Sequence, residues 1–146
     1  MKRKSIRAFA FCVVLFCLCA CTENEPAQTQ SVNNAWPWPD SLEALHAAPN
    51  NHKVILENER VRVLEVTINP HEKEPVHGHR WPSVLYIDKA GDFVDYDHNG
   101  NVLFDSRRVA APLQYPITQW LPPQAPHAVE NLSEVSVHLI RVELKR

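Results

Sequence analysis

Cysteine is absent from most of this chain. All four cysteines of the 146 residues lie between Cys12 and Cys21, so nothing after residue 21 can form a disulfide, act as a thiol nucleophile or offer a thiolate to a metal. Glycine is nearly as scarce, with only three residues, so turns must rely on proline, asparagine and aspartate. The sequence also has no glycine-rich phosphate loop, no Gly-x-Ser-x-Gly elbow and no cysteine-based zinc motif. Any metal must therefore be held by nitrogen and oxygen ligands.

The first twenty residues are typical of a targeting segment. Lys2, Arg3, Lys4 and Arg7 form a basic head, and residues 8–20 form an apolar stretch that is short for a membrane span. The stretch ends in Leu-Cys-Ala-Cys at 18–21, which resembles a bacterial lipobox. We interpret residues 1–20 as a lipoprotein signal peptide and Cys21 as the lipidated residue, carrying acyl chains such as palmitate; an ordinary secretory signal is the alternative.

The anchored protein is expected to face the periplasm from the cell envelope. Thr22 follows the lipidated cysteine, and by resemblance to Gram-negative lipoproteins the absence of aspartate there favours the outer membrane. Residues 21–40 are polar and contain proline, so we predict a tether, followed by one domain over residues 41–146. Trp36 and Trp38 are unusual in a tether and are expected to pack back on the domain; a sticky surface segment that binds a partner is the alternative.

The charge balance argues against some partners. The chain has 15 basic and 17 acidic residues, and removal of the four basic residues of the signal leaves 11 against 17, a net charge of −6. Nucleic acids and anionic lipid surfaces both reward positive charge, so we expect neither as a partner. Membrane attachment would come from the acyl chains.

Two histidines two residues apart carry the strongest chemical signal. His77 and His79 would point to the same face of an extended strand, where both can reach one metal ion. His127 lies in a second strand-like stretch and could close the site. Neutral imidazole is a common ligand for iron, zinc, copper and nickel, so we predict a three-histidine site with open positions for water or substrate.

The rest of the domain reads as short strands. Asp40 is the expected N-cap of a short helix, with Glu43 at the capping-box position. The apolar phase changes within residues 60–68, which suggests a bulge or a bend, and Asn99-Gly100 predicts a hairpin. We predict an all-β double-stranded β-helix, a jelly-roll barrel, with a short N-terminal helix. Its strands are expected at residues 53–57, 60–68, 84–88, 92–97, 102–105, 116–121, 128–131 and 135–144.

Residues 53–144 resemble the two-motif signature of the cupins, in a small single-domain, secreted form. In the first motif, Gly-(x5)-His-x-His-(x3–4)-Glu-(x6)-Gly, the histidines fall on His77 and His79 and the last glycine on Gly91. In the second, Gly-(x5)-Pro-x-Gly-(x2)-His-(x3)-Asn, matches fall on Pro122, His127 and Asn131. The glutamate of the first motif falls on Ser83 or Val84, so the carboxylate is missing; His71, Pro116 and Gln124 replace glycines.

The resemblance implies a divalent metal, with Fe²⁺ favoured and Zn, Ni, Mn or Cu compatible. Some cupin dioxygenases use neutral histidine sets with ferrous iron, and three neutral ligands would favour a small anionic substrate. The function expected is thus an envelope-anchored cupin with a three-histidine metal site, acting as a metal-dependent dioxygenase or isomerase. The alternative is a non-catalytic module that binds a metal or small ligand. Family likeness also makes a homodimer plausible.

Other polar and aromatic residues receive plainer interpretations. We expect His71 and His98 at the surface, and Asn131 as a backbone stabiliser. Arg107 and Arg108 are expected to form a solvated pair, although they could capture a carboxylate. Trp81, Tyr86 and Trp120 are expected in the core or pocket wall, His138 could face the interior, and His46 and His52 belong to the segment that leads into the domain.

Overall fold

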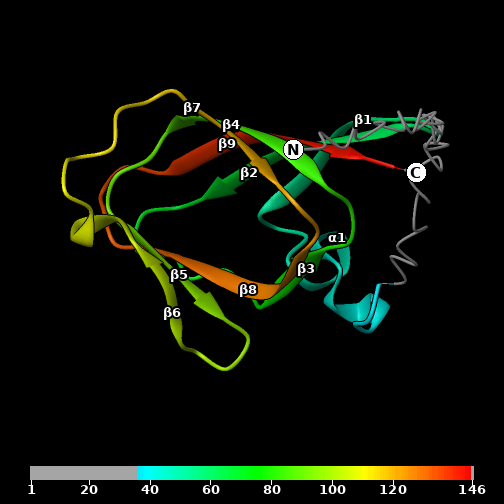
Figure 1. The fold of residues 1–146 in the computed structure, drawn as a ribbon, viewed down its shortest axis with the longest axis horizontal. Helices are drawn as coiled ribbons and strands as arrows, with labels where there is room; N and C mark the ends of the chain where they lie inside the picture. The colour runs from blue at the N-terminus through cyan, green and yellow to red at the C-terminus, as the bar shows by residue number, and fades with distance from the viewer. Residues whose placement is uncertain (1–35, 146) are drawn as a thin grey trace, which may run out of the picture. The chain divides into compact units, whose positions relative to one another are not determined.

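The computed structural model describes residues 36–145 as strands with short helical turns. The signal, the lipidated Cys21 and most of the predicted tether lie outside the described residues. Among the described residues, no helix is long and apolar enough to cross a membrane. Figure 1 shows the elements, which are η1 (Asp40–Leu42), α1 (Ala44–Ala47), β1 (His52–Glu57), β2 (Val61–Ile68), β3 (His77–His79), β4 (Ser83–Lys89), β5 (Phe93–Asp97), β6 (Val102–Asp105), η2 (Ser106–Arg108), β7 (Ile117–Leu121), β8 (Gln124–Asn131) and β9 (Val137–Leu144).

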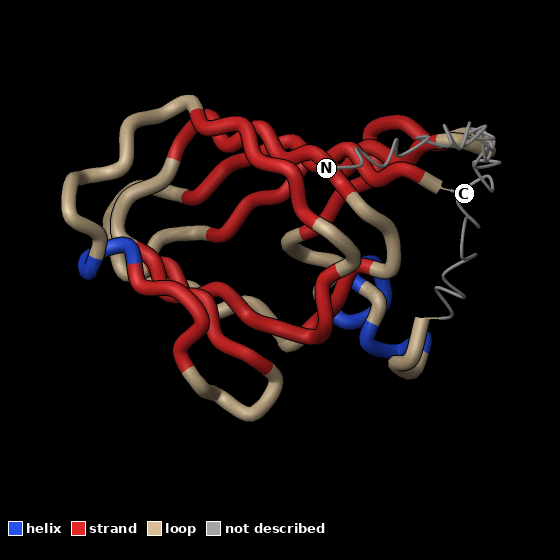
Figure 2. Tube along the Cα trace, in the orientation of Figure 1, coloured by secondary structure: helices blue, strands red, loops and turns tan. Residues whose placement is uncertain are grey.

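The strands form two antiparallel sheets. One has the order β1-β2-β9-β4-β7 and the other the order β3-β8-β5-β6, and consecutive strands repeatedly change sheet. The two sheets lie one above the other with the connections at their ends (Figure 2). One cavity is lined by both sheets, including Val66 of β2 and Val129 of β8. The predicted all-β jelly roll with a short N-terminal helix is confirmed.

Strand β2 forms the centre of the core. Leu64, Val66 and Ile68 are at most 4% exposed, because side chains two residues apart share the inward face. Val61 and Val63 are half-buried on the opposite face, yet β2 pairs with β9 in unbroken register. The bulge predicted within 60–68 is therefore wrong: the change of phase reflects a central strand that is apolar on both faces. The register shift lies instead in β1, between Val54 and Leu56.

The N-terminal helix begins differently from the prediction. Asp40 starts the 3-10 turn η1, and Glu43 is the N-cap of α1, where its carboxylate accepts a hydrogen bond from the Leu45 N–H. The predicted Asp40 cap is thus wrong by three residues. Glu43 is held in place by an ion pair with Arg62, 2.7 Å between Oε1 and Nη1, which favours a cap at this position.

The aromatic residues before the helix pack on the domain, as predicted. A Cβ atom added to Gly78 would lie 2.6 Å from Cη2 of Trp36, so the indole sits directly on the backbone of β3. Trp38 meets the ring of His98 with 5.0 Å between centroids. The hairpin predicted at Asn99-Gly100 also forms, with Gly100 at φ +86° joining β5 to β6.

Candidate metal centre

Strand β3 presents its two histidines side by side. His77 and His79 are each 1% exposed, and their ring centroids lie 5.1 Å apart. The two rings lie side by side because residues two apart on a strand point to the same face, and a single glycine separates these histidines. His77 pairs with His127 across the β3–β8 ladder, and the register then shifts so that His79 faces Gln124.

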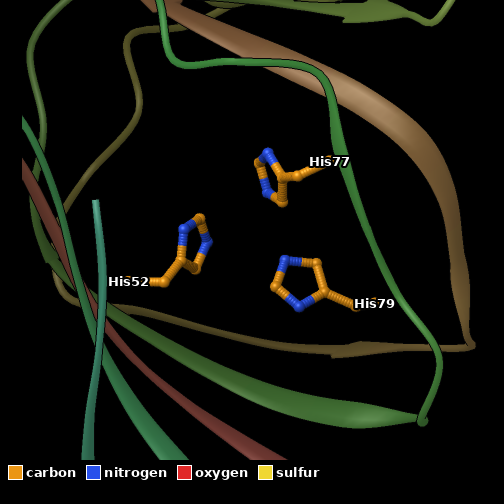
Figure 3. Close-up of side chains that lie close together, drawn as sticks. All are labelled: His52, His77 and His79. Carbon is orange, nitrogen blue, oxygen red and sulfur yellow. The ribbon is translucent and has the colours of Figure 1, made fainter. Parts of the chain in front are cut away.

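The third ring of the tightest cluster comes from His52, which the sequence does not predict as a ligand. His52 begins β1 in the opposite sheet, and its ring centroid lies 4.5 Å from that of His77 and 5.3 Å from that of His79. One ligand nitrogen from each of these three histidines lies within 4.8 Å of the others. Figure 3 shows the three rings around a common space. No motif marks His52, because only the packing of the two sheets brings it to β3.

His127 lies beside this cluster. Its ring centroid is 4.8 Å from that of His77 and 6.0 Å from that of His79, and it is 7% exposed. Its Nε2 atom is buried and has no hydrogen-bond partner within the described chain. The structure thus brings the predicted His77 and His79 together, leaves His127 next to them, and adds His52.

Each of the four rings is fixed through its Nδ1 atom. In His77, Nδ1 donates to the carbonyl of Pro75 at 2.9 Å, and in His52 to the carbonyl of Ala48 at 3.2 Å. The other two rings use carboxylates: His79 meets Glu143 at 2.8 Å and His127 meets Asp95 at 2.9 Å. A hydrogen on Nδ1 leaves a lone pair on Nε2, which is the usual arrangement of a histidine that ligates a metal.

Burial keeps the imidazoles of His52, His77 and His79 neutral. It lowers the pKa of His52 to about 4, and it lowers the pKa values of His77 and His79 well below the ordinary value. Neutral imidazole is the form that binds metals. The donor set, the free Nε2 atoms and the orphaned Nε2 of His127 therefore fit a divalent transition metal.

A carboxyl group also stands at the cluster, although not at the motif position. Glu74 is 3% exposed, and its Oε1 atom lies 4.0 Å from Nε2 of His77 and accepts a hydrogen bond from the Val129 N–H. Burial raises the pKa of Glu74 to about 8. At the motif position, Ser83 is fully buried and does not line the cavity, so the missing carboxylate is not replaced from there.

The histidines open on a cavity of about 390 Å³ whose wall is mostly apolar. Within residues 36–145, nine buried side-chain nitrogen or oxygen atoms have no hydrogen-bond partner, and six of these belong to residues that line this cavity. Such atoms are rare in proteins unless a ligand or water satisfies them. They are Glu74 Oε2, Tyr115 Oη, Gln124 Oε1, His127 Nε2, and Nε and Nη2 of Arg141.

Arg141 is the charged member of this set. It is 3% exposed, and burial lowers its pKa to about 10, so the guanidinium stays protonated at neutral pH. Arg107 and Arg108 stand apart as an exposed pair on the carboxylate of Asp105, as predicted. Arg141 could not be predicted as a site residue, because nothing in the sequence distinguishes an inward-facing arginine of the last strand.

Of the remaining predictions for polar and aromatic residues, some are confirmed and others are wrong. His71 and His98 are exposed, and Asn131 donates from Nδ2 to the carbonyls of Ile68, Asn69 and Val135, as expected for a backbone stabiliser. His138 faces away from the cavity and meets Asp88 and Glu65. Three aromatic residues expected in the core or pocket wall do not line the cavity: Trp81 lies against Arg62, and Tyr86 and Trp120 are 47% and 56% exposed.

The fold matches solved cupin structures. A cupin-domain protein from Bordetella pertussis Tohama I is 23% identical, with a TM-score of 0.53 over 65% of this chain and 92% of that chain. An RmlC-like cupin family protein from Methanocaldococcus jannaschii is 12% identical, with a TM-score of 0.49 over 64% of this chain and 78% of that one. No protein-family model and no curated protein matches the sequence. The chain therefore has the cupin fold, the double-stranded β-helix, which confirms the predicted resemblance at the level of fold.

Proposed function

We propose that this protein is a divalent-metal-binding cupin that takes up a small anionic molecule next to the metal. One observation carries the proposal: four buried, closely packed histidines each use Nδ1 to hold the ring, which leaves Nε2 free. A purely structural cluster would satisfy its nitrogens internally, yet Nε2 of His127 is buried and unpartnered among the described residues.

His77 and His79 would hold the ion together with His127, as the sequence predicts, and His52 would add a fourth imidazole. Ferrous iron is the favoured ion, with zinc, nickel, manganese or copper compatible with the same ligands. A bound ion would supply a Lewis acid and, if ferrous, a centre for dioxygen chemistry. Neutral imidazoles leave its charge uncompensated, which favours an anionic ligand. Glu74, 4.0 Å from His77 Nε2, is placed to accept or donate a proton beside that ligand.

Metal content tests the proposal. Elemental analysis of the purified protein, prepared without a chelating tag, should find near one equivalent of a transition metal, and His77→Ala or His79→Ala should lose it. His71→Ala is the matched control, because His71 is an exposed histidine on a turn. A folded protein that takes up no metal after anaerobic reconstitution would refute the proposal.

Catalysis is the finer part of the proposal. We propose oxygen-dependent or isomerase chemistry on the bound anion. Oxygen consumption by the iron-loaded protein with small carboxylates would reveal the first, and conversion of a carboxylate into its isomer without oxygen uptake would reveal the second. The alternative is a non-catalytic module that holds a metal or ligand. The lack of a carboxylate at Ser83 or Val84 favours that alternative. Metal and ligand binding without turnover would support the module.

We further propose that Cys21 anchors the protein by lipid to the cell envelope, facing the periplasm and, in a Gram-negative cell, on the outer membrane. The lipobox at residues 18–21 supports this proposal. Labelled palmitate should enter the wild-type protein and not Cys21→Ser. Equal labelling of both would contradict lipidation at this residue.

A further inference from the structure

Arg141 lies on the central strand of the five-stranded sheet, and its side chain lines the cavity. It lies on β9, and the residues directly opposite on the two neighbouring strands are Leu64 of β2 and Leu85 of β4. Both leucines are buried and share the inward face with Arg141. Neither neighbour across the sheet can therefore accept a hydrogen bond from the guanidinium.

The nearest acidic group is already engaged elsewhere. Nε of Arg141 lies 3.8 Å from Oε1 of Glu143, which is longer than a hydrogen bond. That oxygen binds Nδ1 of His79 at 2.8 Å, and the other Glu143 oxygen lies 3.6 Å from Nη1 of Arg62. Within the described residues, Nε and Nη2 of Arg141 are buried with no hydrogen-bond partner. A buried guanidinium left in this state is costly, so the site lacks an acceptor.

We propose that Arg141 anchors the carboxylate of a small, mostly apolar ligand in the cavity. A planar carboxylate matches the two parallel N–H groups of a guanidinium edge. The ligand's apolar body would lie along Val66, Ile68, Val129 and Leu139, which line the same space. A cavity of about 390 Å³ suits a molecule of this kind. Anion binding by Arg141 stands without a metal; contact of the ligand's other end with the histidines rests on the proposed function.

The charges around Arg141 favour a carboxylate over a phosphate ester. Arg141 offers one positive charge, while Glu74 lines the same cavity and Oε1 of Glu143 lies 3.8 Å from Nε of Arg141. A dianion would be repelled by these groups when they ionise, whereas a monoanion is neutralised by the single guanidinium.

Calorimetric titration of the metal-stripped protein with hexanoate, hexanamide and hexyl phosphate tests the inference. Hexanoate should bind at least about tenfold more tightly than hexanamide, since a charge-assisted, two-pronged contact is stronger than a neutral one. Arg141→Met should abolish this preference, and Arg141→Lys should weaken it. Arg107→Gln, at the exposed arginine pair, should retain it.

The outcomes separate this inference from the metal proposal. Equal binding of hexanoate and hexanamide, no saturable binding of hexanoate, or a preference that survives in Arg141→Met would overturn the inference. Tighter binding of hexyl phosphate would overturn the carboxylate class. If Arg141→Met does not fold, Arg141→Lys and the wild-type comparison decide. Metal content measured on the same proteins before the metal is stripped reports on the histidines alone, so wild-type protein that carries metal but shows no carboxylate preference defeats only the role of Arg141.

Discussion

The carboxylate behind His127 gives a way to ask whether that histidine binds metal. Asp95 meets Nδ1 of His127 at 2.9 Å inside the domain, while Asp88 forms the equivalent pair with His138 on the opposite face. Loss of a group that orients a ligating histidine commonly lowers metal affinity 10- to 100-fold. We expect Asp95→Ala to weaken metal binding by about tenfold in a competition titration with a chromophoric chelator.

Asp88→Ala is the matched control, because it frees a histidine that does not line the cavity. It should leave metal affinity unchanged. Equal affinities in the two variants would argue that His52, rather than His127, completes the site with His77 and His79.

Glu74 predicts a pH dependence of stability in the metal-free protein. In the unfolded chain it ionises near 4.5, and in the folded protein near 8. Between these values the folded state holds one more proton, so this group's contribution to stability falls as pH rises, by about 1.4 kcal/mol per pH unit. In urea unfolding, the free energy of unfolding of wild type should therefore fall by about 2 kcal/mol relative to that of Glu74→Gln between about pH 5.5 and about pH 7.5.

The sign of the pH dependence distinguishes the contribution of Glu74 to stability from that of the histidines. His52, with its lowered pKa of about 4, makes stability rise with pH over the window from 4 to 6.5, and this term is common to both proteins. Glu59→Gln, on an exposed turn, should follow wild type at both pH values. A Glu74→Gln profile parallel to wild type would mean that Glu74 ionises normally in the fold.

Part of this site could be predicted from the sequence. His77 and His79 were predictable because their spacing alone places them on one face of a strand. His52, Glu74 and Arg141 were not, because they meet the histidines only through the packing of two sheets and carry no local pattern. Glu74 and Arg141 each carry a buried polar atom without a partner among the described residues, and His52 reaches the cluster from the opposite sheet; both are properties of the fold.

At the scale of elements, strand β3 is clamped between the N-terminal segment and β8. A Cβ on Gly78 would lie 2.6 Å from the Trp36 ring and 3.0 Å from the carbonyl oxygen of Gln124. Overpacking of this kind typically costs about 1–3 kcal/mol. We expect Gly78→Ala to destabilise the protein by that amount in chemical unfolding and to change tryptophan fluorescence.

A Trp36→Leu background provides the control. Gly78→Ala should cost less there, because the ring clash is removed, while the contact with Gln124 remains. The same cost in both backgrounds would show that Trp36 does not lie on β3 in solution.

Strands and turns were more predictable than their irregularities. Asn99-Gly100 marked the β5–β6 hairpin because the turn needs a positive φ, which Gly100 adopts at +86°. The register shift lies in β1 and not within residues 60–68. The change of apolar phase in residues 60–68 instead reflects a central strand with apolar residues on both faces. The helix cap moved to Glu43 because its ion pair with Arg62, a tertiary contact, outweighs the local pattern around Asp40.

For the molecule as a whole, metal binding should raise the unfolding temperature. A ligand that binds only the folded state stabilises it by about 2.7 kcal/mol at 100 times its dissociation constant. For a domain of this size that corresponds to a shift on the order of 10 °C. Differential scanning calorimetry with and without the metal should show this shift in wild type and in His71→Ala, and not in His77→Ala. A wild-type unfolding temperature indifferent to metal would contradict specific binding.

Assembly and anchoring remain predictions at this scale. The homodimer expected by family likeness can be checked by sedimentation equilibrium. The lipid anchor at Cys21 involves residues that the structure does not describe, so the prediction of lipidation rests on the lipobox sequence alone.

The most direct measurement is an anomalous-difference map, recorded at the metal's absorption edge from crystals grown with zinc or ferrous iron. We predict one strong peak at the histidine cluster, at about 2.0–2.1 Å from the Nε2 atoms of His77 and His79 for zinc. His52, His127 or both would complete the ligands. A cluster without a peak in a well-ordered crystal, with the rings bonded to one another or to water, would contradict metal binding by these histidines.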